Sequence, residues 1–164
     1  MKFVSIVMGS KSDYEVMKAC SETLTKFGVA HEMIISSAHR SPERTQAYVK
    51  SAEAKGAQVF IAAAGMAAHL AGALAASTTR PILGIPMESG PLGGEDALLS
   101  TVMMPAGMPV GTLAIGKAGA VNAAYLAVQI MALEDDELRV KLQEDRVSKA
   151  KKVELDSSEI EILL

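Results

Sequence analysis

Short apolar runs alternate with helical segments along most of this chain, and this alternation limits the fold more than any other feature. Residues 3–8, 59–63 and 82–85 are nearly all apolar, without the polar–apolar alternation of a strand that faces water on one side. Such runs are typical of strands in a parallel sheet that helices cover on both faces. The sequence therefore predicts an α/β fold.

Helix signals separate these runs. Gly28 and Gly56 are placed to end the first two helices, and Ser41 and Pro42 to begin the second as N-cap and first residue. The predicted strands are 3–8, 32–35, 59–63, 82–85 and 110–115, and the later helices 67–77, 95–102, 122–133 and a charged 136–153. Five strands separated by helices predict a flavodoxin-like three-layer sandwich, a parallel five-stranded sheet with helices on both faces. We expect one domain over residues 1–164, whose C-terminal helix and tail, from about 136 to 164, lie outside the sandwich or on a neighbour.

Composition indicates self-association and argues against nucleic acid as a partner. Hydrophobic residues make up 49% of the 164 residues, but aromatic residues only 4%. Because small apolar side chains each bury little area, we expect a homo-oligomer that gains burial from partner subunits. A formal net charge of −3, with no basic stripe, is unsuited to a row of phosphates.

The sequence predicts a cytoplasmic protein without a membrane span. Residues 1–4 lead straight into the first strand with no secretory signal, and Cys20 is the only cysteine, which excludes an intramolecular disulfide. The stretch 59–77 is apolar enough to suggest a membrane helix, but Gly65 and the region of His69 interrupt it. We expect a buried strand, a tight loop and a buried helix there.

Ligands in this architecture bind beyond the carboxyl ends of the strands, which directs attention to the loops that follow them. The first loop, 9–13, combines a glycine turn, two hydroxyls and the free N–H groups of a helix start, which suits a phosphate. Asp13 is suited to accept hydrogen bonds from sugar hydroxyls. Taken alone, an ordinary turn with a hydroxyl N-cap is the simpler explanation, and the loop lacks the spacing of triphosphate or dinucleotide motifs.

The next two loops each carry a histidine. In 36–42, Arg40 suits a phosphate and His39 suits proton transfer near neutral pH, although a solvated surface loop has the same pattern. In 64–70, His69 lies among small apolar residues, as a core histidine or a residue of a tight, dry pocket does. No carboxylate or thiolate accompanies the histidines at ligand spacing, so we expect no metal site. Together the three loops indicate one site, since the fold brings these strand ends together.

Four motifs resemble the N5-carboxyaminoimidazole ribonucleotide mutase family, the class I PurE proteins. They are VMGSKSD at 7–13, SAHR and a Ser-Pro at 37–42, AAHL at 67–70, and MP-G-PVGTLAIGKAGA-NAA across 104–124. The resemblance covers about residues 3–133, and GSKSD followed by SAHR is highly specific. It implies an isomerase of purine biosynthesis that moves a carboxylate from N5 to C4 of the imidazole without ATP, metal, biotin or another cofactor.

The resemblance also implies roles for particular residues. Those that hold the phosphate are Ser10, Ser12, Ser37 and Arg40. Asp13 is implied to hold the ribose and His39 to be the general acid and base. The pocket that keeps released carbon dioxide beside the ring is lined by Ala64, Gly65, His69 and Leu70. The family is octameric, with sites near subunit boundaries, so a homo-octamer is expected.

Three residues depart from the family pattern, and other functions compete with the mutase. Met66 stands where a second glycine is common, Ala71 where proline is frequent, and Met103 where glutamine is usual. The alternative is the related branch that carboxylates aminoimidazole ribonucleotide directly with carbon dioxide, but it tends to carry SAHK, and Arg40 favours the mutase. Scarce aromatic residues disfavour a flavin-binding module, and 62–64 lacks the aspartate of a receiver domain.

Overall fold

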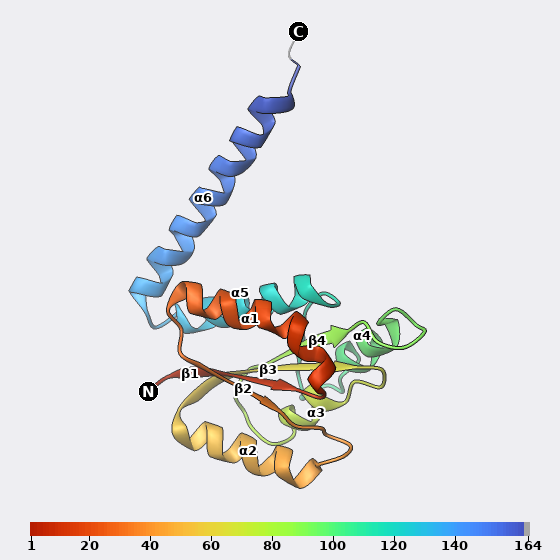
Figure 1. Cartoon of the computed structure of the whole chain (residues 1–164). Coiled ribbons are helices and arrows are strands. Elements are labelled where there is room, and N and C mark those ends of the chain that lie inside the picture. The colour runs from red at the N-terminus through yellow and green to blue at the C-terminus, as the bar shows by residue number, and fades with distance from the viewer. Residues whose placement is uncertain (163–164) are drawn as a thin grey trace.

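The computed structural model describes residues 1–162 and contains one sheet of five parallel strands (Figure 1). The strands are β1 (Phe3–Met8), β2 (His31–Ile35), β3 (Ala57–Gly65), β4 (Ile82–Met87) and β5 (Gly111–Thr112). Their order is β2-β1-β3-β4-β5, which is the strand order of flavodoxin-like folds. The predicted fold class is confirmed.

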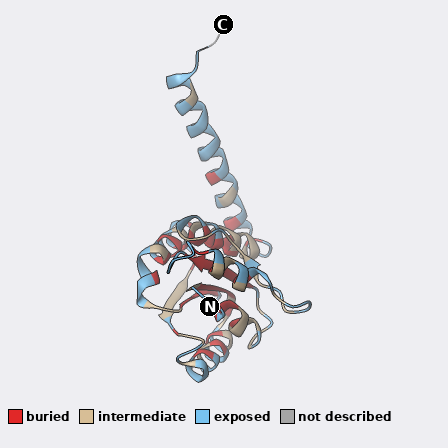
Figure 2. Cartoon of the chain, turned by 90° about the vertical axis from the view of Figure 1, so that its right-hand side faces the viewer, coloured by how far each residue is buried: buried red, intermediate tan, exposed pale blue. Residues whose placement is uncertain are grey.

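Helices cover both faces of this sheet. They are α1 (Tyr14–Phe27), α2 (Pro42–Lys55), α3 (Leu70–Ala75), α4 (Glu95–Val102), α5 (Lys117–Met131) and α6 (Asp136–Ile160), and a short 3-10 helix, η1 (Lys11–Asp13), precedes α1. α1 and α5 lie on one face, and α2 and α3 lie on the other (Figure 1). The buried residues gather between these layers (Figure 2).

The side chains of β1 show why its sequence is apolar at every position except Ser5. Val4, Ile6 and Met8 pack in the core that α1 and α5 complete, whereas Phe3 and Val7 pack in a second core with α2 and α3. Successive side chains of a strand point to opposite faces, so a strand covered on both faces buries every position. The nearly unbroken apolar run follows from this double burial, and the buried Ser5 hydroxyl is hydrogen-bonded to the Tyr48 hydroxyl at 2.8 Å.

The ends of the first two helices lie where the glycines predict them. Gly28 and Gly56 adopt left-handed backbone conformations, with φ of 74° and 114°, and end α1 and α2. α2 begins at Pro42, with Ser41 as its N-cap residue. The Ser41 hydroxyl does not cap the helix, however, because it accepts a hydrogen bond from the Ser37 N–H at 3.1 Å and donates one to the Ser37 carbonyl at 3.1 Å. It therefore closes the loop that carries His39.

Four strands have boundaries that differ from the prediction, and β2 differs least, since it begins at His31 instead of residue 32. β3 extends two residues beyond each end of 59–63, because it pairs with β1 on one side and β4 on the other. β5 ends at Thr112 instead of residue 115, and β4 continues through Pro86 to Met87. β5 pairs only with Leu83 and Gly84, so the missing N–H of Pro86 leaves no β5 ladder bond unmade. Beyond β5, the Gly116 N–H donates to the Pro86 carbonyl at 2.9 Å.

The helix predicted at 67–77 is shorter, because its first residues form a turn. The His69 N–H donates to the Ala67 carbonyl at 3.0 Å, and the Ala68 N–H donates to the Ser100 hydroxyl of α4 at 2.9 Å. α3 therefore begins only at Leu70. The expected sequence of buried strand, tight loop and helix is confirmed.

α5 begins at Lys117, before the predicted start at residue 122. Its first turn passes very close to the preceding chain at Gly119, where a β-carbon would lie 1.7 Å from the Ala114 carbonyl oxygen. Glycine lowers helix propensity, so Gly119 weakens the sequence pattern that would predict an earlier helix start. In the structure, the missing side chain of Gly119 permits the close approach. The short α4 at 95–102 agrees with its prediction.

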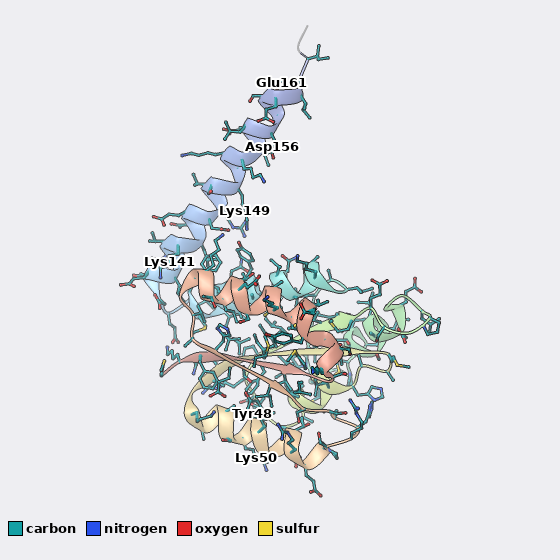
Figure 3. The ribbon with its side chains drawn as sticks, in the orientation of Figure 1. Tyr48, Lys50, Lys141, Lys149, Asp156 and Glu161 are labelled. Atoms are coloured by element: carbon teal, nitrogen blue, oxygen red, sulfur yellow. The ribbon has the colours of Figure 1, made fainter. Side chains whose placement is uncertain are left out.

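α6 is a 25-residue helix that extends away from the sandwich and continues to Ile160, beyond the predicted residue 153 (Figure 1). Leu138 is buried in its first turn, and the helix is mostly exposed beyond Lys149 (Figures 2 and 3). Within residues 1–162, no helix has both the length and the apolar character needed to cross a membrane. The single domain over 1–164 stays a prediction, and residues 163–164 lie outside the described part.

Candidate active site

A cavity of about 510 Å³ lies beyond the carboxyl ends of β1 to β4. All ten residues that the sequence predicted for the site line it: Ser10, Ser12, Asp13, Ser37, His39, Arg40, Ala64, Gly65, His69 and Leu70. They come together because β2, β1 and β3 are neighbours in the sheet, and parallel strands end at the same edge. The roles of these residues stay predictions.

Side chains of the first loop hold it in shape. Asp13 accepts a hydrogen bond from the Ser10 N–H at 3.2 Å, and the Ser10 hydroxyl accepts bonds from the Ser12 N–H at 3.3 Å and the Ser12 hydroxyl at 3.0 Å. Asp13 is 6% exposed, and this burial raises the pKa of its carboxyl, although the hydrogen bonds from Ser10 and Ser12 act in the opposite direction. The loop thus places two adjacent hydroxyls on the cavity, backed by a carboxyl group.

Arg40 joins the second loop to the first. Its Nη2 donates to the Gly9 carbonyl at 3.1 Å, and its Nε donates to the Ser37 hydroxyl at 3.4 Å. The same hydroxyl accepts the Arg40 backbone N–H at 3.1 Å, so side chain and backbone are both fixed by Ser37. A permanent cation therefore lies beside the hydroxyls of the first loop, an arrangement suited to a phosphate group.

The two histidines of the cavity are in direct contact. His39 Nε2 lies 2.7 Å from His69 Nδ1, and the ring centroids are 4.8 Å apart in an edge-to-face arrangement at 78°. His31, the third histidine, lies at the amino end of β2, where its ring bonds to the Ser21 hydroxyl and the Val29 carbonyl. The chain's three histidines therefore do not converge on one point.

The deciding comparison is with protein families: the model of the AIR carboxylase family matches residues 3–152. This chain belongs to the AIR carboxylase family. Curated relatives include the N5-carboxyaminoimidazole ribonucleotide mutases of Brucella melitensis and Escherichia coli strain K12. Each is 51% identical over 150 residues, which is 92% of this chain and 93% and 89% of the relatives. The Bacillus subtilis mutase is 48% identical over 156 residues, 95% of this chain and 96% of its own.

A solved structure from the same family has the same fold. PurE from Treponema denticola superimposes with a TM-score of 0.89 at 27% sequence identity, covering 99% of this chain and 100% of that one. The resemblance read from the motifs is therefore confirmed, and it extends beyond the predicted limit of residue 133 into α6.

Met66 has a backbone conformation that favours glycine. Its φ is 55°, the left-handed region that disfavours a side chain, and it is the only non-glycine with positive φ among residues 1–162. Met66 lines the cavity and is 58% exposed, with its Cγ near the position that a β-carbon on Gly90 would take, at 3.8 Å. The glycine expected here from the family would avoid this strain.

Ser89 is a cavity residue that the sequence analysis missed. It follows β4 and lies against the neighbouring Gly65, where a β-carbon would be 1.9 Å from the Ser89 hydroxyl oxygen. Gly65 therefore allows the loop after β4 to close against the end of β3. Ser89 follows the carboxyl end of the fourth strand, so the rule that ligands bind at strand ends also predicts it as a site residue.

A second hollow, of about 590 Å³, lies along α6 and is lined only by residues 140–155 of that helix. It contains no paired titratable groups of the kind that the histidine cavity has, and one helix alone cannot enclose a ligand. We therefore place the active site at the strand ends.

Proposed function

We propose that this member of the AIR carboxylase family is an N5-carboxyaminoimidazole ribonucleotide mutase of purine biosynthesis. It interconverts the N5-carboxylated and C4-carboxylated aminoimidazole ribonucleotides by decarboxylation and recarboxylation, without ATP. The observation that carries the proposal is one cavity in which an arginine–hydroxyl cluster and a histidine pair meet. The nearly full-length identity to proteins named as mutases supports it.

The hydroxyls and Arg40 hold the substrate phosphate in this proposal. Ser10, Ser12 and Ser37 supply neutral hydrogen-bond donors, and Arg40 supplies the charge that balances the phosphate. Asp13 holds the ribose from the same loop. Binding the nucleotide by its phosphate and sugar leaves the imidazole ring to reach toward the histidines.

His39 carries the proton. When the bond between N5 and the carboxylate breaks, carbon dioxide leaves and the electron pair stays on N5, which takes a proton from His39. C4 then attacks the carbon dioxide, a carbon–carbon bond forms, and His39 takes up the proton that C4 loses. One imidazole therefore suffices, because donation and uptake cancel.

The small residues around the end of β3 keep carbon dioxide beside the ring. Ala64 and Gly65 line the cavity with small groups, and Leu70 and His69 limit the escape of carbon dioxide. Exclusion of water prevents the loss or hydration of a reactive intermediate. The direct carboxylase, the alternative function, has no observation of its own in its favour.

A homo-octamer in the cytoplasm is part of the same proposal. Large apolar side chains on and beside α4 are exposed, namely Leu92, Leu99, Val102 and Met103. Exposed large apolar side chains of this kind are typical of a surface that meets another subunit. Light scattering should give eight times the chain mass, and a monomer mass would contradict the assembly.

The activity is tested by giving the purified protein the C4-carboxylated nucleotide without ATP and following both isomers, aminoimidazole ribonucleotide and bicarbonate. The N5-carboxylated isomer should appear rapidly. Formation of only aminoimidazole ribonucleotide and carbon dioxide would assign the protein to the direct carboxylases. The absence of any turnover would contradict the proposed function.

A further inference from the structure

The contact between His39 and His69 has a consequence for the direction of proton transfer. On the basis of the proposed mutase reaction, we propose that His69 fixes the tautomer of His39. His69 accepts a hydrogen bond from Nε2–H of His39, and Nδ1 of His39 is the atom that exchanges the proton with the substrate. His69 is thus a positioning residue for the catalytic imidazole.

The geometry requires one donor and one acceptor between the rings. A separation of 2.7 Å between His39 Nε2 and His69 Nδ1 is that of a hydrogen bond, in which one nitrogen carries the hydrogen and the other offers a lone pair. Two N–H groups facing each other at this distance would repel, and two lone pairs would leave both nitrogens unsatisfied. The remaining question is which ring donates.

The proposed reaction decides the direction. His39 begins and ends the cycle as an imidazolium, in which both ring nitrogens carry hydrogen. His39 Nε2 is then a donor, and His69 Nδ1 accepts only if the His69 ring is neutral with its hydrogen on Nε2. Between the two proton transfers His39 is neutral, and the contact with His69 keeps the hydrogen on Nε2. The proton that moves is therefore the one on Nδ1.

The surroundings of both rings agree with these roles. Within residues 1–162, Nδ1 of His39 has no hydrogen-bond partner, so it is available to a substrate in the cavity. The backbone of His69 is fixed on both sides, by its N–H bond to the Ala67 carbonyl at 3.0 Å and by the Ala73 N–H bond to its own carbonyl at 2.9 Å. The neighbouring Leu70 is buried. The backbone that carries the His69 ring is therefore held in place.

The kinetics of two His69 variants distinguish a role as hydrogen-bond acceptor for His39 from a role that only fills space in the cavity. His69→Asn keeps an acceptor oxygen close to the place of Nδ1, whereas His69→Leu has similar bulk and no acceptor. A catalytic imidazole in the wrong tautomer loses up to about ten thousandfold in kcat. We expect His69→Leu to lower kcat at least about tenfold with little change in KM, and His69→Asn to recover most of that loss. His31→Asn, in the histidine outside the cavity, is the matched control and should keep the wild-type kcat.

An NMR spectrum of the imidazole nitrogens shows the tautomer of His39 without any substrate. The chain has three histidines, so 15N labelling of histidine gives few imidazole signals, and His39→Asn identifies those of His39. At pH 8.5, the wild-type protein should show His39 with hydrogen on Nε2, and His69→Leu should show a mixture of tautomers. Hydrogen on Nδ1 of His39 in the wild type, or equal kcat losses in the Leu and Asn variants, would overturn the proposal. A wild-type protein without turnover would defeat the mutase function instead, while the spectrum would still report the contact.

Discussion

His39 lies on a loop at the edge of the sheet, where its side chain contributes little to the cores on either face. We predict that His39→Asn abolishes interconversion of the carboxylated nucleotides, with a loss of about a hundred- to ten-thousandfold, because the variant removes the group proposed to carry the proton. Nucleotide binding should persist. Isothermal titration with the nucleotide and the isomerase assay measure the two effects separately.

Arg40→Ala, in the residue next to His39, should have the opposite balance of effects on binding and turnover. It removes the cation that bonds to Gly9 and Ser37, so it should weaken nucleotide binding far more than His39→Asn does. If the His39 variant lost binding and the Arg40 variant kept it, the assignment of proton carrier and phosphate holder would be reversed.

Met66 is a residue at which strain can be measured directly. A side chain in the left-handed region costs about 1–2 kcal/mol, and a glycine loses about 0.5–1 kcal/mol in backbone entropy. Met66→Gly should therefore raise the free energy of unfolding by up to about 1.5 kcal/mol, as read from urea denaturation. Met66→Ala keeps the β-carbon and should give no gain; equal stabilisation by both variants would show that the backbone is not strained.

Among the elements, α5 depends on one glycine for its approach to the preceding chain. A β-carbon on Gly119 would meet the Ala114 carbonyl oxygen at 1.7 Å and its carbon at 2.7 Å, and a backbone cannot rotate away as a side chain can. Gly119→Ala should cost more than about 2 kcal/mol of unfolding free energy. Gly72→Ala in α3 is the control, since its nearest neighbour is the flexible Met104 at 3.4 Å. Equal shifts of both urea midpoints would refute the close approach.

The sequence predicted the elements that depend on local patterns and missed those that depend on distant neighbours. β1 and the ends of α1 and α2 follow from an apolar run and two glycines, which act within a few residues. The short β5 could not be predicted, because its length depends on where β4 lies beside it. The start of α5 at Lys117, before the predicted residue 122, could not be predicted either, because it depends on a close approach that only the folded chain defines.

The site shows the same division. Its three loops could be found because strand ends of a parallel sheet share one edge and the motifs there are specific. The contact of His39 with His69 could not, since it joins residues 30 positions apart through a distance that no spacing rule sets. Ser89 enters the cavity only because Gly65 leaves room for it.

At the scale of the whole molecule, Asp145 attaches α6 to the sandwich. It accepts hydrogen bonds from Tyr125 of α5 at 2.8 Å and from Lys26 of α1, and it pairs with Lys149 of its own helix at 2.8 Å. Burial alone would raise the pKa of Asp145, but the bonds from Lys149, Lys26 and Tyr125 outweigh it and hold the pKa below its usual range. This stabilisation is present above the unfolded pKa of about 3.9 and is lost as pH falls further.

Asp145→Asn removes the charge and keeps the shape. We predict a local loss of about 1–2 kcal/mol, because the hydrogen bonds become neutral and the lysines are half exposed. Hydrogen exchange of α6 at pH 7 should then be roughly five- to thirtyfold faster, and the wild type should lose the same protection progressively as the pH falls from about 4 toward the lowered pKa of folded Asp145. Asp156→Asn, an exposed position on the same helix (Figure 3), should change nothing; equal effects of the two substitutions would contradict the anchoring role.

The central claim is that the carboxyl carbon leaves N5 and joins C4 inside one site. The most direct measurement supplies N5-carboxyaminoimidazole ribonucleotide with a 13C-labelled carboxylate, in unlabelled bicarbonate and without ATP, and determines the label in the C4-carboxylated product. We predict that most of the label is retained, because the carbon dioxide stays in the cavity between the two steps. Product that carries only unlabelled carbon would show that the carbon dioxide comes from solution, and would contradict the mutase function.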